Sequence, residues 1–331
     1  MFVLDPPVSS GQPYYADVID YLLNNPAVCG ADFSIPWNSI DAGPNATPRY
    51  NWSLLAQDIA PWQGAGKKVN LIFQTVGYGP NQSFIPPYVL SQVQTIRCGS
   101  SSVTPLFWEP TYVSLYESYI RAVVGHFQGD PAIGYMRFGL GVGGETFPLY
   151  GLQNNSECDQ VLNATGFTPS NWTSYLVSML GFEHSLGSQI QLMVSLNEIF
   201  PGISDNVSRT VAATAASLDI GIGSEGLTAG QVNYSASGSP TCGVGSCRFF
   251  EEYSGQVPLE FQTLTPSQPN GSGPTGSLTV MLPWAVGVHA QIFELHLNDW
   301  LTAFDPIYPA YAQYHVAYSD AFNAAAAVVD G

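Results

Sequence analysis

The sequence is poor in positive charge. Eight Lys and Arg residues stand against 25 Asp and Glu residues, which leaves a net charge of −17. Proteins bind nucleic acids and anionic membrane surfaces through clusters of basic side chains. This chain has too few basic residues for such a cluster, so we expect neither partner. Charged residues of either sign make up only 10% of the chain. A neutral ligand suits this composition, because it requires no counter-charge.

The sequence also lacks long apolar runs and any metal-binding spacing of cysteine and histidine. No apolar stretch approaches the roughly 20 residues that cross a lipid bilayer, so no membrane span is expected. The five cysteines and five histidines are scattered, without the short paired spacings of zinc sites. We therefore expect neither a metal nor another cofactor. No signal peptide is visible, and we interpret the chain as a secreted protein whose targeting segment has been removed.

Sequons and cysteines both favour an extracellular protein. Asn-x-Ser/Thr sequons accept N-linked glycans on the surface of secreted eukaryotic proteins. Nine occur, at Asn45, Asn51, Asn81, Asn154, Asn163, Asn171, Asn206, Asn233 and Asn270. Cys242 and Cys247 bracket four residues and are candidates to close a tight loop. Cys98 and Cys158 fall in two loops that would be neighbours in a barrel. Cys29 lies in an apolar strand, where we expect a buried free thiol.

Strand-like and helix-like segments alternate along the whole chain. The expected strands cover residues 2–5, 28–37, 69–75, 133–138, 190–198, 220–225, 257–263 and 290–300. The expected helices cover residues 14–23, 52–62, 112–127, 172–186, 206–218, 248–253, 278–288 and 318–329. Eight such units predict an α/β protein, a (β/α)8 barrel forming one domain over residues 1–331. Counting residues 2–5 as a strand is the weakest step, because seven strands would instead predict an open α/β sheet.

One glycine-rich segment delivers a single acid, Glu145. The four glycines that precede it are Gly139, Gly141, Gly143 and Gly144. Glycines at this density let the backbone turn sharply and approach a ligand closely. Three of them also match the dinucleotide-binding pattern Gly-x-Gly-x-x-Gly. At such a site Glu145 would repel phosphate, and Pro148 would interrupt the helix that must follow. We therefore do not expect a dinucleotide here.

In a (β/α)8 barrel, function lies at the C-terminal ends of the strands. The candidate residues at or near these ends are Trp37, Asn38, Tyr78, Arg137, Glu145, Asn197, Glu198, Glu225, Glu260, Glu294, His296, Asp299 and Trp300. A ring of carboxylates and aromatic side chains with few cations suits glycoside hydrolysis. In that reaction one carboxylic acid protonates the leaving oxygen, and a second carboxylate acts as nucleophile or as base toward water. Tryptophan faces would stack on sugar rings, and Arg137 would order a catalytic carboxylate.

Glutamates at the ends of the fourth and seventh predicted strands resemble the layout of clan A glycoside hydrolases, the retaining (β/α)8 enzymes. The resemblance implies that Glu145 is the acid/base and that Glu260 is the nucleophile. One departure concerns the residue before the acid/base, which is Asn in many members and Gly144 in this chain. An Asn-Glu pair occurs one strand later, at Asn197 and Glu198. If the strand count is shifted by one, Glu198 becomes the acid/base.

A second and more local resemblance is to β-amylases. The segment from Gly139 to Tyr150 is similar to their Gly-Leu-Gly-x-x-Gly-Glu segment, which is followed by Pro and Tyr. In that family the glutamate is the general acid of an inverting mechanism. No counterpart of the other β-amylase motifs is present. The resemblance therefore supports the role of Glu145 and does not imply starch as the substrate.

We predict a secreted glycoside hydrolase that cleaves a neutral oligosaccharide, polysaccharide or glycoconjugate. Glu145 and Glu260 would carry the reaction by a retaining mechanism, and the other candidate residues would bind the carbohydrate. Three alternatives stay open: an inverting glycosidase, a barrel that binds glycans without cleaving them, and a transglycosylase that uses the same residues.

Overall fold

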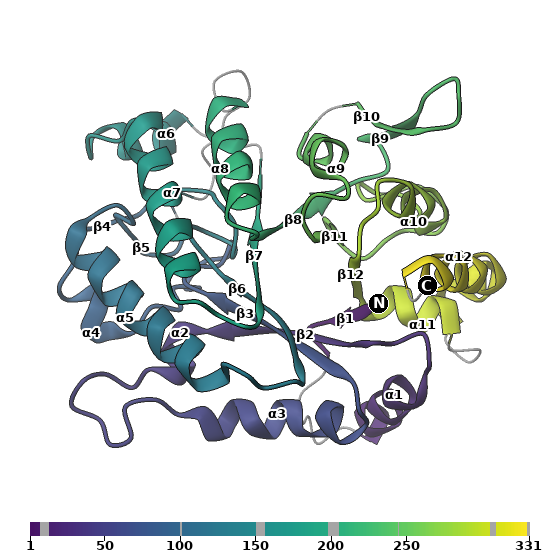
Figure 1. The fold of residues 1–331 in the computed structure, drawn as a ribbon, viewed down its shortest axis with the longest axis horizontal. Helices are drawn as coiled ribbons and strands as arrows, with labels where there is room; N and C mark the ends of the chain where they lie inside the picture. The colour runs from purple at the N-terminus through teal and green to yellow at the C-terminus, as the bar shows by residue number, and fades with distance from the viewer. Residues whose placement is uncertain are drawn as a thin grey trace. The chain divides into compact units, whose positions relative to one another are not determined.

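Eight parallel strands form a closed barrel in the computed structural model of the protein (Figure 1). They are β1 (Phe2–Leu4), β2 (Gly30–Pro36), β3 (Lys68–Gln74), β6 (Ile133–Phe138), β7 (Gln191–Ser195), β8 (Gly221–Leu227), β11 (Leu259–Thr263) and β12 (Ile292–His296). Their order around the barrel is β1-β12-β11-β8-β7-β6-β3-β2. The predicted (β/α)8 barrel is confirmed, and the open-sheet alternative is wrong. The structure describes residues 1–6, 13–99, 101–149, 156–197, 205–243, 245–304 and 309–329.

The predicted helices are present as well. They are α1 (Pro13–Asn24), α3 (Trp52–Gly64), α5 (Pro110–Phe127), α7 (Pro169–Ser185), α8 (Asp205–Ser217), α9 (Cys247–Tyr253), α10 (Leu278–Gly287) and α12 (His315–Val329). The sequence pattern did not predict the shorter elements α2 (Trp37–Ile40), α4 (Pro87–Leu90), α6 (Ser156–Asn163), α11 (Leu297–Phe304), the 3-10 helix η1 (Pro309–Tyr314), and the strand pairs β4 (Thr95–Ile96) with β5 (Thr104–Pro105) and β9 (Val232–Tyr234) with β10 (Pro240–Cys242).

The chain divides into two compact units. Unit 1 comprises Met1–Phe33, Asp58–Asn70 and Gly221–Gly331, and unit 2 comprises Ser34–Gln57 and Leu71–Ile220. Within unit 1, β1 pairs in parallel with β2 and β12, and β11 pairs in parallel with β8 and β12. Within unit 2, β6 pairs in parallel with β7. That residues 1–331 form one domain stays a prediction.

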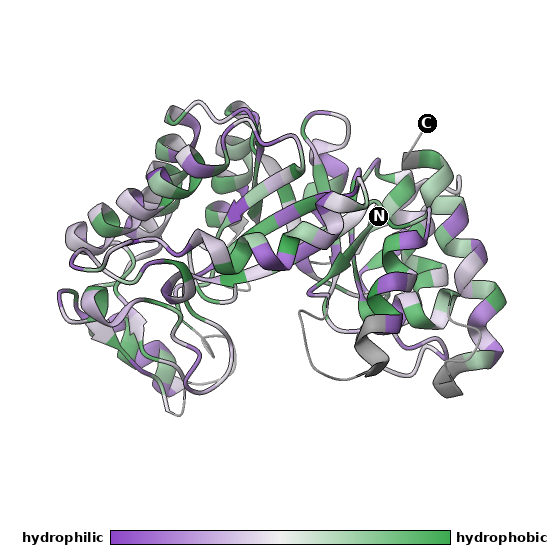
Figure 2. Cartoon of the chain, turned by 90° about the horizontal axis from the view of Figure 1, so that it is seen from below, coloured by the Kyte–Doolittle hydropathy of each residue, from purple (hydrophilic) through white to green (hydrophobic). Residues whose placement is uncertain are grey.

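The core of unit 2 is built on the aromatic face of α5. Tyr112, Tyr116 and Tyr119 recur at helical spacing and are all fully buried. Trp37 of α2 packs against these three rings, with centroid distances of 6.2, 5.1 and 5.0 Å. Figure 2 shows apolar and polar residues interleaved along the helices, as expected when only part of a helix surface is buried.

Two disulfides join cysteines that the sequence made candidates to pair. Cys98–Cys158 spans 60 residues of unit 2, and Cys242–Cys247 spans 5 residues of unit 1. The expectation of disulfides is confirmed, and the structure decides which cysteines pair. Cys29 takes part in neither disulfide and is half-buried rather than fully buried as predicted. Within the described part of the chain, no helix combines the length and the apolar character needed to cross a membrane.

Candidate active site

Glu145 lies on the loop that follows β6, and only 4% of the residue is exposed. Gly143 and Gly144 adopt φ angles of 77° and 80°, a left-handed conformation that glycine takes at little cost. At Gly141 a side chain has no room, because a Cβ there would lie 2.3 Å from the carbonyl oxygen of Phe147. The glycines therefore fold a tight loop that presents a buried glutamate, which is a different use from a phosphate cradle.

Buried side-chain donors hold the backbone carbonyls of this loop. A buried carbonyl oxygen without a donor is costly, so these contacts fix the path of the backbone. The donors and acceptors are Tyr116 Oη to Gly139 O at 2.9 Å, Tyr175 Oη to Leu140 O at 3.0 Å, Thr75 Oγ1 to Gly141 O at 3.1 Å, and Trp172 Nε1 to Thr146 O at 3.1 Å. The loop carrying Glu145 is thus anchored from α5, from α7 and from the residue that follows β3.

Two other predicted residues contact the same loop. The N–H of Asn197, just beyond β7, donates to Thr146 Oγ1 at 3.4 Å, one residue from Glu145. Tyr78 lies against Gly143, where a Cβ would be 2.3 Å from its ring, and Tyr78 is 40% exposed. Asn197, Tyr78 and Glu145 are therefore brought together within unit 2. Arg137 is buried in β6 with 1% exposure, and Glu198 lies outside the described residues.

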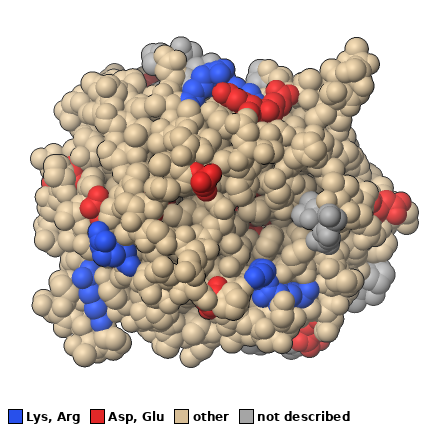
Figure 3. Space-filling view, viewed as in Figure 1, with Lys and Arg blue, Asp and Glu red and all other residues tan. Residues whose placement is uncertain are grey.

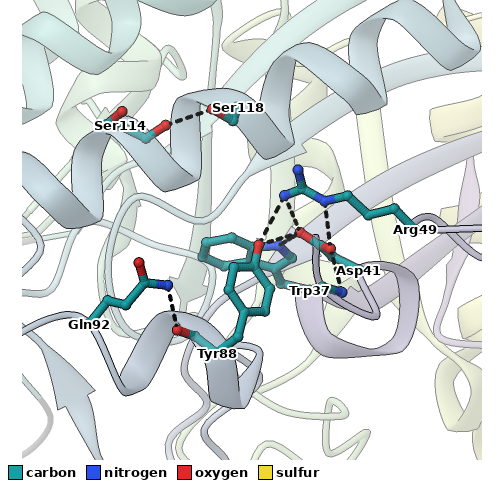
Figure 4. A network of polar contacts seen from close by, with 8 residues as sticks. Trp37, Asp41, Arg49, Tyr88, Gln92, Ser114 and Ser118 are labelled. Carbon is teal, nitrogen blue, oxygen red and sulfur yellow. Dashed lines mark hydrogen bonds and ion pairs between the residues drawn. The ribbon is translucent and has the colours of Figure 1, made fainter. Parts of the chain in front are cut away.

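Trp37 and Asn38 lie in the short helix α2, beyond the end of β2. Trp37 is 0% exposed, with its ring packed among the tyrosines of α5. Its indole N–H donates to Asp41 Oδ2 at 3.3 Å (Figure 4). The structure thus makes Trp37 a core residue with no ring face open to a sugar. Asn38 is exposed.

Beside Trp37 lies a polar network that the sequence pattern did not predict (Figure 4). Arg49 donates from Nε and Nη2 to the two carboxylate oxygens of Asp41, both at 3.0 Å. Tyr88 Oη donates to Asp41 Oδ2 at 2.7 Å. Burial acts to raise the pKa of Asp41, but the hydrogen bonds from Arg49, Tyr88 and the Gly43 N–H outweigh it and lower that pKa. Asp41 and Arg49 are loop residues, so no periodicity pairs them.

Unit 1 buries carboxyl groups on the two strands that flank β1. Asp32 of β2 and Glu294 of β12 are both 0% exposed. Burial raises the pKa of Glu294 well above its usual value, and the nearby charges of Asp32 and Asp5 raise it further. Asn70 Nδ2 donates to Asp32 Oδ1 at 2.6 Å. Glu294 was predicted near the barrel mouth, but it is the third of five residues in β12. The sequence analysis did not predict Asp32 and Asn70, although polar residues inside the apolar strands β2 and β3 could have indicated them.

Glu260 is the second residue of the five-residue strand β11. The predicted layout placed it at the C-terminal end of this strand, so its position is corrected. Glu260 pairs with Gly223 of β8 and with Ile292 at the start of β12. The residue is 0% exposed. Glu225 is nearer the C-terminal end of its strand, as the fifth of seven residues in β8, and is half-buried.

The last predicted strand is shorter than expected. It ends at His296, so Asp299 and Trp300 lie in helix α11. Asp299 accepts hydrogen bonds from the Ser267 N–H, at 3.0 Å, and from Ser267 Oγ. Trp300 is 0% exposed and stacks on Phe304. The structure therefore makes Asp299 an anchor for the loop after β11, and it makes Trp300 a core residue.

His296 is the remaining candidate from the sequence. Its Nε2 lies 3.2 Å from the carbonyl oxygen of Thr263, the last residue of β11. Burial lowers the pKa of this imidazole, which favours its neutral form. A neutral ring whose Nε2–H donates to this carbonyl fits the geometry. The contact joins the ends of β11 and β12.

Charges are sparse on the molecular surface. The face in Figure 3 is mostly uncharged, with a few separated basic and acidic side chains. Among the described residues, no group of three or more His, Cys, Asp and Glu side chains is arranged to hold a metal ion.

Comparison with protein-family models and with curated protein sequences finds no match. Solved structures do match. The catalytic domain of β-amylase from Paenibacillus polymyxa superposes with a TM-score of 0.57 and 14% identity, over 89% of this chain and 92% of that chain. β-Galactosidase from the psychrophilic Marinomonas ef1 has a TM-score of 0.55 and 11% identity, over 98% of this chain and 59% of that chain.

The exo-β-1,4-mannosidase Op5Man5 from Opitutaceae bacterium strain TAV5 has a TM-score of 0.52 and 12% identity, over 100% of this chain and 60% of that chain. The chain thus spans about 60% of the length of the galactosidase and the mannosidase. At identities this low, the similarity is one of fold.

Proposed function

We propose that this protein is a glycoside hydrolase in which Glu145 is the general acid. The observation that carries the proposal is the presentation of Glu145, a buried carboxyl group on a rigidly anchored loop after β6. Function in (β/α)8 barrels lies at such strand ends. A partly desolvated carboxyl group is suited to hold a proton for a leaving oxygen. The three proteins of similar fold, a β-amylase, a β-galactosidase and an exo-β-1,4-mannosidase, are named for action on carbohydrates.

The substrate we propose is a neutral carbohydrate. Only eight Lys and Arg residues occur in the whole chain, and the face in Figure 3 carries no extended basic patch. An anionic sugar would require a counter-charge at the site. Tyr78 is the predicted aromatic residue whose ring is accessible beside the Glu145 loop. It is therefore our candidate to stack on a sugar ring, with Asn197 as a hydrogen-bonding neighbour.

The second carboxylate is proposed to be that of Glu260. Glu260 is the nucleophile in a retaining mechanism, as the clan A resemblance implies. Glu260 is only the second of the five residues in β11, whereas Glu225 lies nearer the C-terminal end of β8. Glu225 is therefore the competing candidate. If the second carboxylate instead activates water, the enzyme inverts the anomeric centre. The stereochemistry of the first-formed product, followed by NMR, decides between retention and inversion.

The role of Glu145 as general acid is tested by measuring the hydrolysis of a panel of 4-nitrophenyl and natural glycosides by wild type and by Glu145→Gln. General acid catalysis contributes about 10²–10⁴-fold, so we expect a loss of kcat in this range on natural glycosides. Glu251→Gln is the matched control, because Glu251 is exposed on α9. Full activity of Glu145→Gln would contradict the assignment. Sugar binding with no turnover by the wild-type protein would instead indicate a glycan-binding barrel.

The test of the second carboxylate compares Glu260→Ala with Glu225→Ala, each with added azide. A small anion can occupy the space of a missing nucleophile and form a glycosyl azide of inverted configuration. We expect this product from Glu260→Ala. The same product from Glu225→Ala alone would transfer the role to Glu225.

We also propose that the protein is secreted and glycosylated. Two disulfides are typical of oxidising compartments. Of the nine sequon asparagines, those with exposed side chains are Asn45, Asn51, Asn81, Asn163, Asn206, Asn233 and Asn270. Asn171 is half-buried, and Asn154 lies outside the described residues. Glycosidase release of N-glycans followed by peptide mass spectrometry would identify the occupied sites.

A further inference from the structure

Two tyrosine hydroxyls reach the backbone of the Glu145 loop from outside the strand that bears it. Tyr116 of α5 donates to Gly139 O at 2.9 Å, and Tyr175 of α7 donates to Leu140 O at 3.0 Å. The two acceptors are consecutive residues at the point where β6 becomes the loop. Both tyrosines are buried, with exposures of 0% and 5%. Neither side chain is therefore exposed to bulk solvent.

We propose that Tyr116 and Tyr175 are positioning residues. By donating hydrogen bonds to the carbonyls of Gly139 and Leu140, they hold Glu145 in the geometry that proton transfer requires. The inference rests on the proposed role of Glu145 as general acid. A catalytic group must be held within a fraction of an ångström of its productive position by the residues that support it. Because the loop is rich in glycine, its own backbone supplies little stiffness. The side-chain donors supply it instead.

The electrostatics of the pair suit a permanent donor role. Burial raises the pKa of both tyrosines well above the usual value, so each hydroxyl keeps its proton over the working pH range. A hydrogen bond in this buried setting is stronger than in water. A carbonyl that loses its donor there also costs more free energy. Removal of either hydroxyl should therefore let the loop move to find another donor.

The same helix provides a matched control in Tyr119. This residue is also 0% exposed and belongs to the same aromatic cluster. Within the described part of the chain, however, its hydroxyl has no hydrogen-bond partner. Tyr119→Phe therefore removes a buried hydroxyl from α5 without releasing a loop carbonyl. Any general effect of this substitution type on folding will be visible in that variant.

The first experiment compares Tyr116→Phe, Tyr175→Phe and Tyr119→Phe on two glycosides of the same sugar. One glycoside has an alkyl leaving group, which departs only when protonated. The other has a 2,4-dinitrophenyl leaving group, which departs with little help from an acid. We expect kcat/KM, which reports the step in which the leaving group departs, to fall about 10-fold or more on the alkyl glycoside in the first two variants. On the dinitrophenyl glycoside it should change less than about 3-fold, and Tyr119→Phe should resemble wild type on both.

The second experiment needs no activity. Hydrogen–deuterium exchange of the peptide covering residues 138–147 should be faster in Tyr116→Phe and Tyr175→Phe than in wild type, and unchanged in Tyr119→Phe. Equal exchange in all four proteins, or an equal loss of activity on both glycosides, would overturn the positioning role. If a tyrosine variant fails to fold, Thr75→Val removes the donor to Gly141 O and tests the same claim.

The two proposals fail in different ways. If wild type hydrolyses no glycoside, or if Glu145→Gln is fully active, the proposed function fails, and the exchange experiment still decides whether the tyrosines hold the loop. If wild type depends on Glu145 while Tyr116→Phe and Tyr175→Phe behave as Tyr119→Phe does, the positioning role alone is wrong.

Discussion

Gly223 and Glu260 occupy one small volume on adjacent strands. A Cβ built on Gly223 of β8 would lie 2.1 Å from Oε2 of Glu260 on β11. The two residues are also register partners. The carboxyl group of Glu260 is thus accommodated because its neighbour has no side chain. The position of the Glu260 carboxylate thus requires a glycine at position 223, inside strand β8.

We therefore expect Gly223→Ala to displace Glu260 and to lower the free energy of unfolding. Overpacking of a buried site costs about 1–3 kcal/mol. Gly226→Ala is the matched control, because Gly226 lies on the same strand and a Cβ there meets nothing within 4 Å. Urea unfolding of both variants gives the comparison. Equal stability of the two variants would show that the site adapts without cost.

Gly143→Ala should disturb the Glu145 loop for two separable reasons. Gly143 has a φ of 77°, which costs a non-glycine residue about 1–2 kcal/mol. A Cβ there would also lie 2.3 Å from the ring of Tyr78. The double variant Gly143→Ala/Tyr78→Ala removes the clash and leaves the backbone strain. A double-mutant cycle on unfolding free energies should therefore show a favourable coupling, and strict additivity would mean that the ring of Tyr78 moves aside freely.

Asp299 should make stability decrease as pH rises from about 4 to about 7. Burial raises the pKa of Asp299 to about 7 in the folded protein, despite the opposing hydrogen bonds from Ser267, whereas an unfolded Asp titrates near about 3.9. Between these values the folded state holds a proton that the unfolded state has released. The free energy of unfolding therefore falls by up to about 1.4 kcal/mol per pH unit from this group.

Asp299→Asn removes this titration and keeps an oxygen that accepts from Ser267. The variant should be more stable than wild type at pH 8 and should lose that advantage at acidic pH. Asp320→Asn, an exposed site on α12, should leave the pH dependence unchanged. Thermal unfolding across this pH range gives the result. Curves for Asp299→Asn and wild type that run parallel would contradict the assignment.

Arg49→Lys should weaken the anchoring of the loop after α2. Lysine cannot reproduce the two parallel hydrogen bonds that Arg49 donates to buried Asp41 (Figure 4). Because Arg49 is 30% exposed, solvent screens part of the effect, and we expect a loss of about 1–2 kcal/mol. Arg97→Lys is the control, because Arg97 is exposed and forms no ion pair with any residue that the structure describes.

The pH dependence of this loss has the opposite sign to that of Asp299. The pKa of Asp41 is lowered in the folded protein, since the bonds from Arg49 and Tyr88 outweigh burial. The stabilisation is therefore present above the unfolded pKa of about 3.9 and disappears as pH falls through the folded pKa. Urea unfolding should show the full difference between Arg49→Lys and wild type at pH 7, and the difference should shrink as pH falls below about 3.9. A difference that is constant with pH would mean that the ionised pair is not its source.

The strand and helix pattern could be predicted because it is local. Apolar runs in β3 and the regular spacing of Tyr112, Tyr116 and Tyr119 in α5 are visible in a few consecutive residues. The barrel prediction made Cys98 and Cys158 candidates to pair, because it places successive loops side by side, and the structure joins them. The end of β12 was misplaced, because Leu297 continues the alternation of Leu295 and His296 while the backbone changes there from strand to helix.

The functions of individual side chains were harder to predict. Trp37 and Trp300 follow strands, as sugar-stacking residues would, yet both are fully buried. Exposure depends on which helices cover a ring, and those helices come from distant parts of the chain. Trp37 is covered by α5 and Trp300 by α12. Asp299 likewise meets Ser267, 32 residues away in sequence.

The sequence by itself determined the (β/α)8 barrel and the glycine-rich turn that carries Glu145. These features depend on periodicity, on backbone freedom and on residue type, all of which are visible in a few consecutive residues. Only the tertiary structure decided that the hydroxyls of Tyr116 and Tyr175 hold the loop of Glu145, and that Gly223 makes room for Glu260. Such contacts join residues far apart in the chain, so their geometry exists only once the helices and strands have packed.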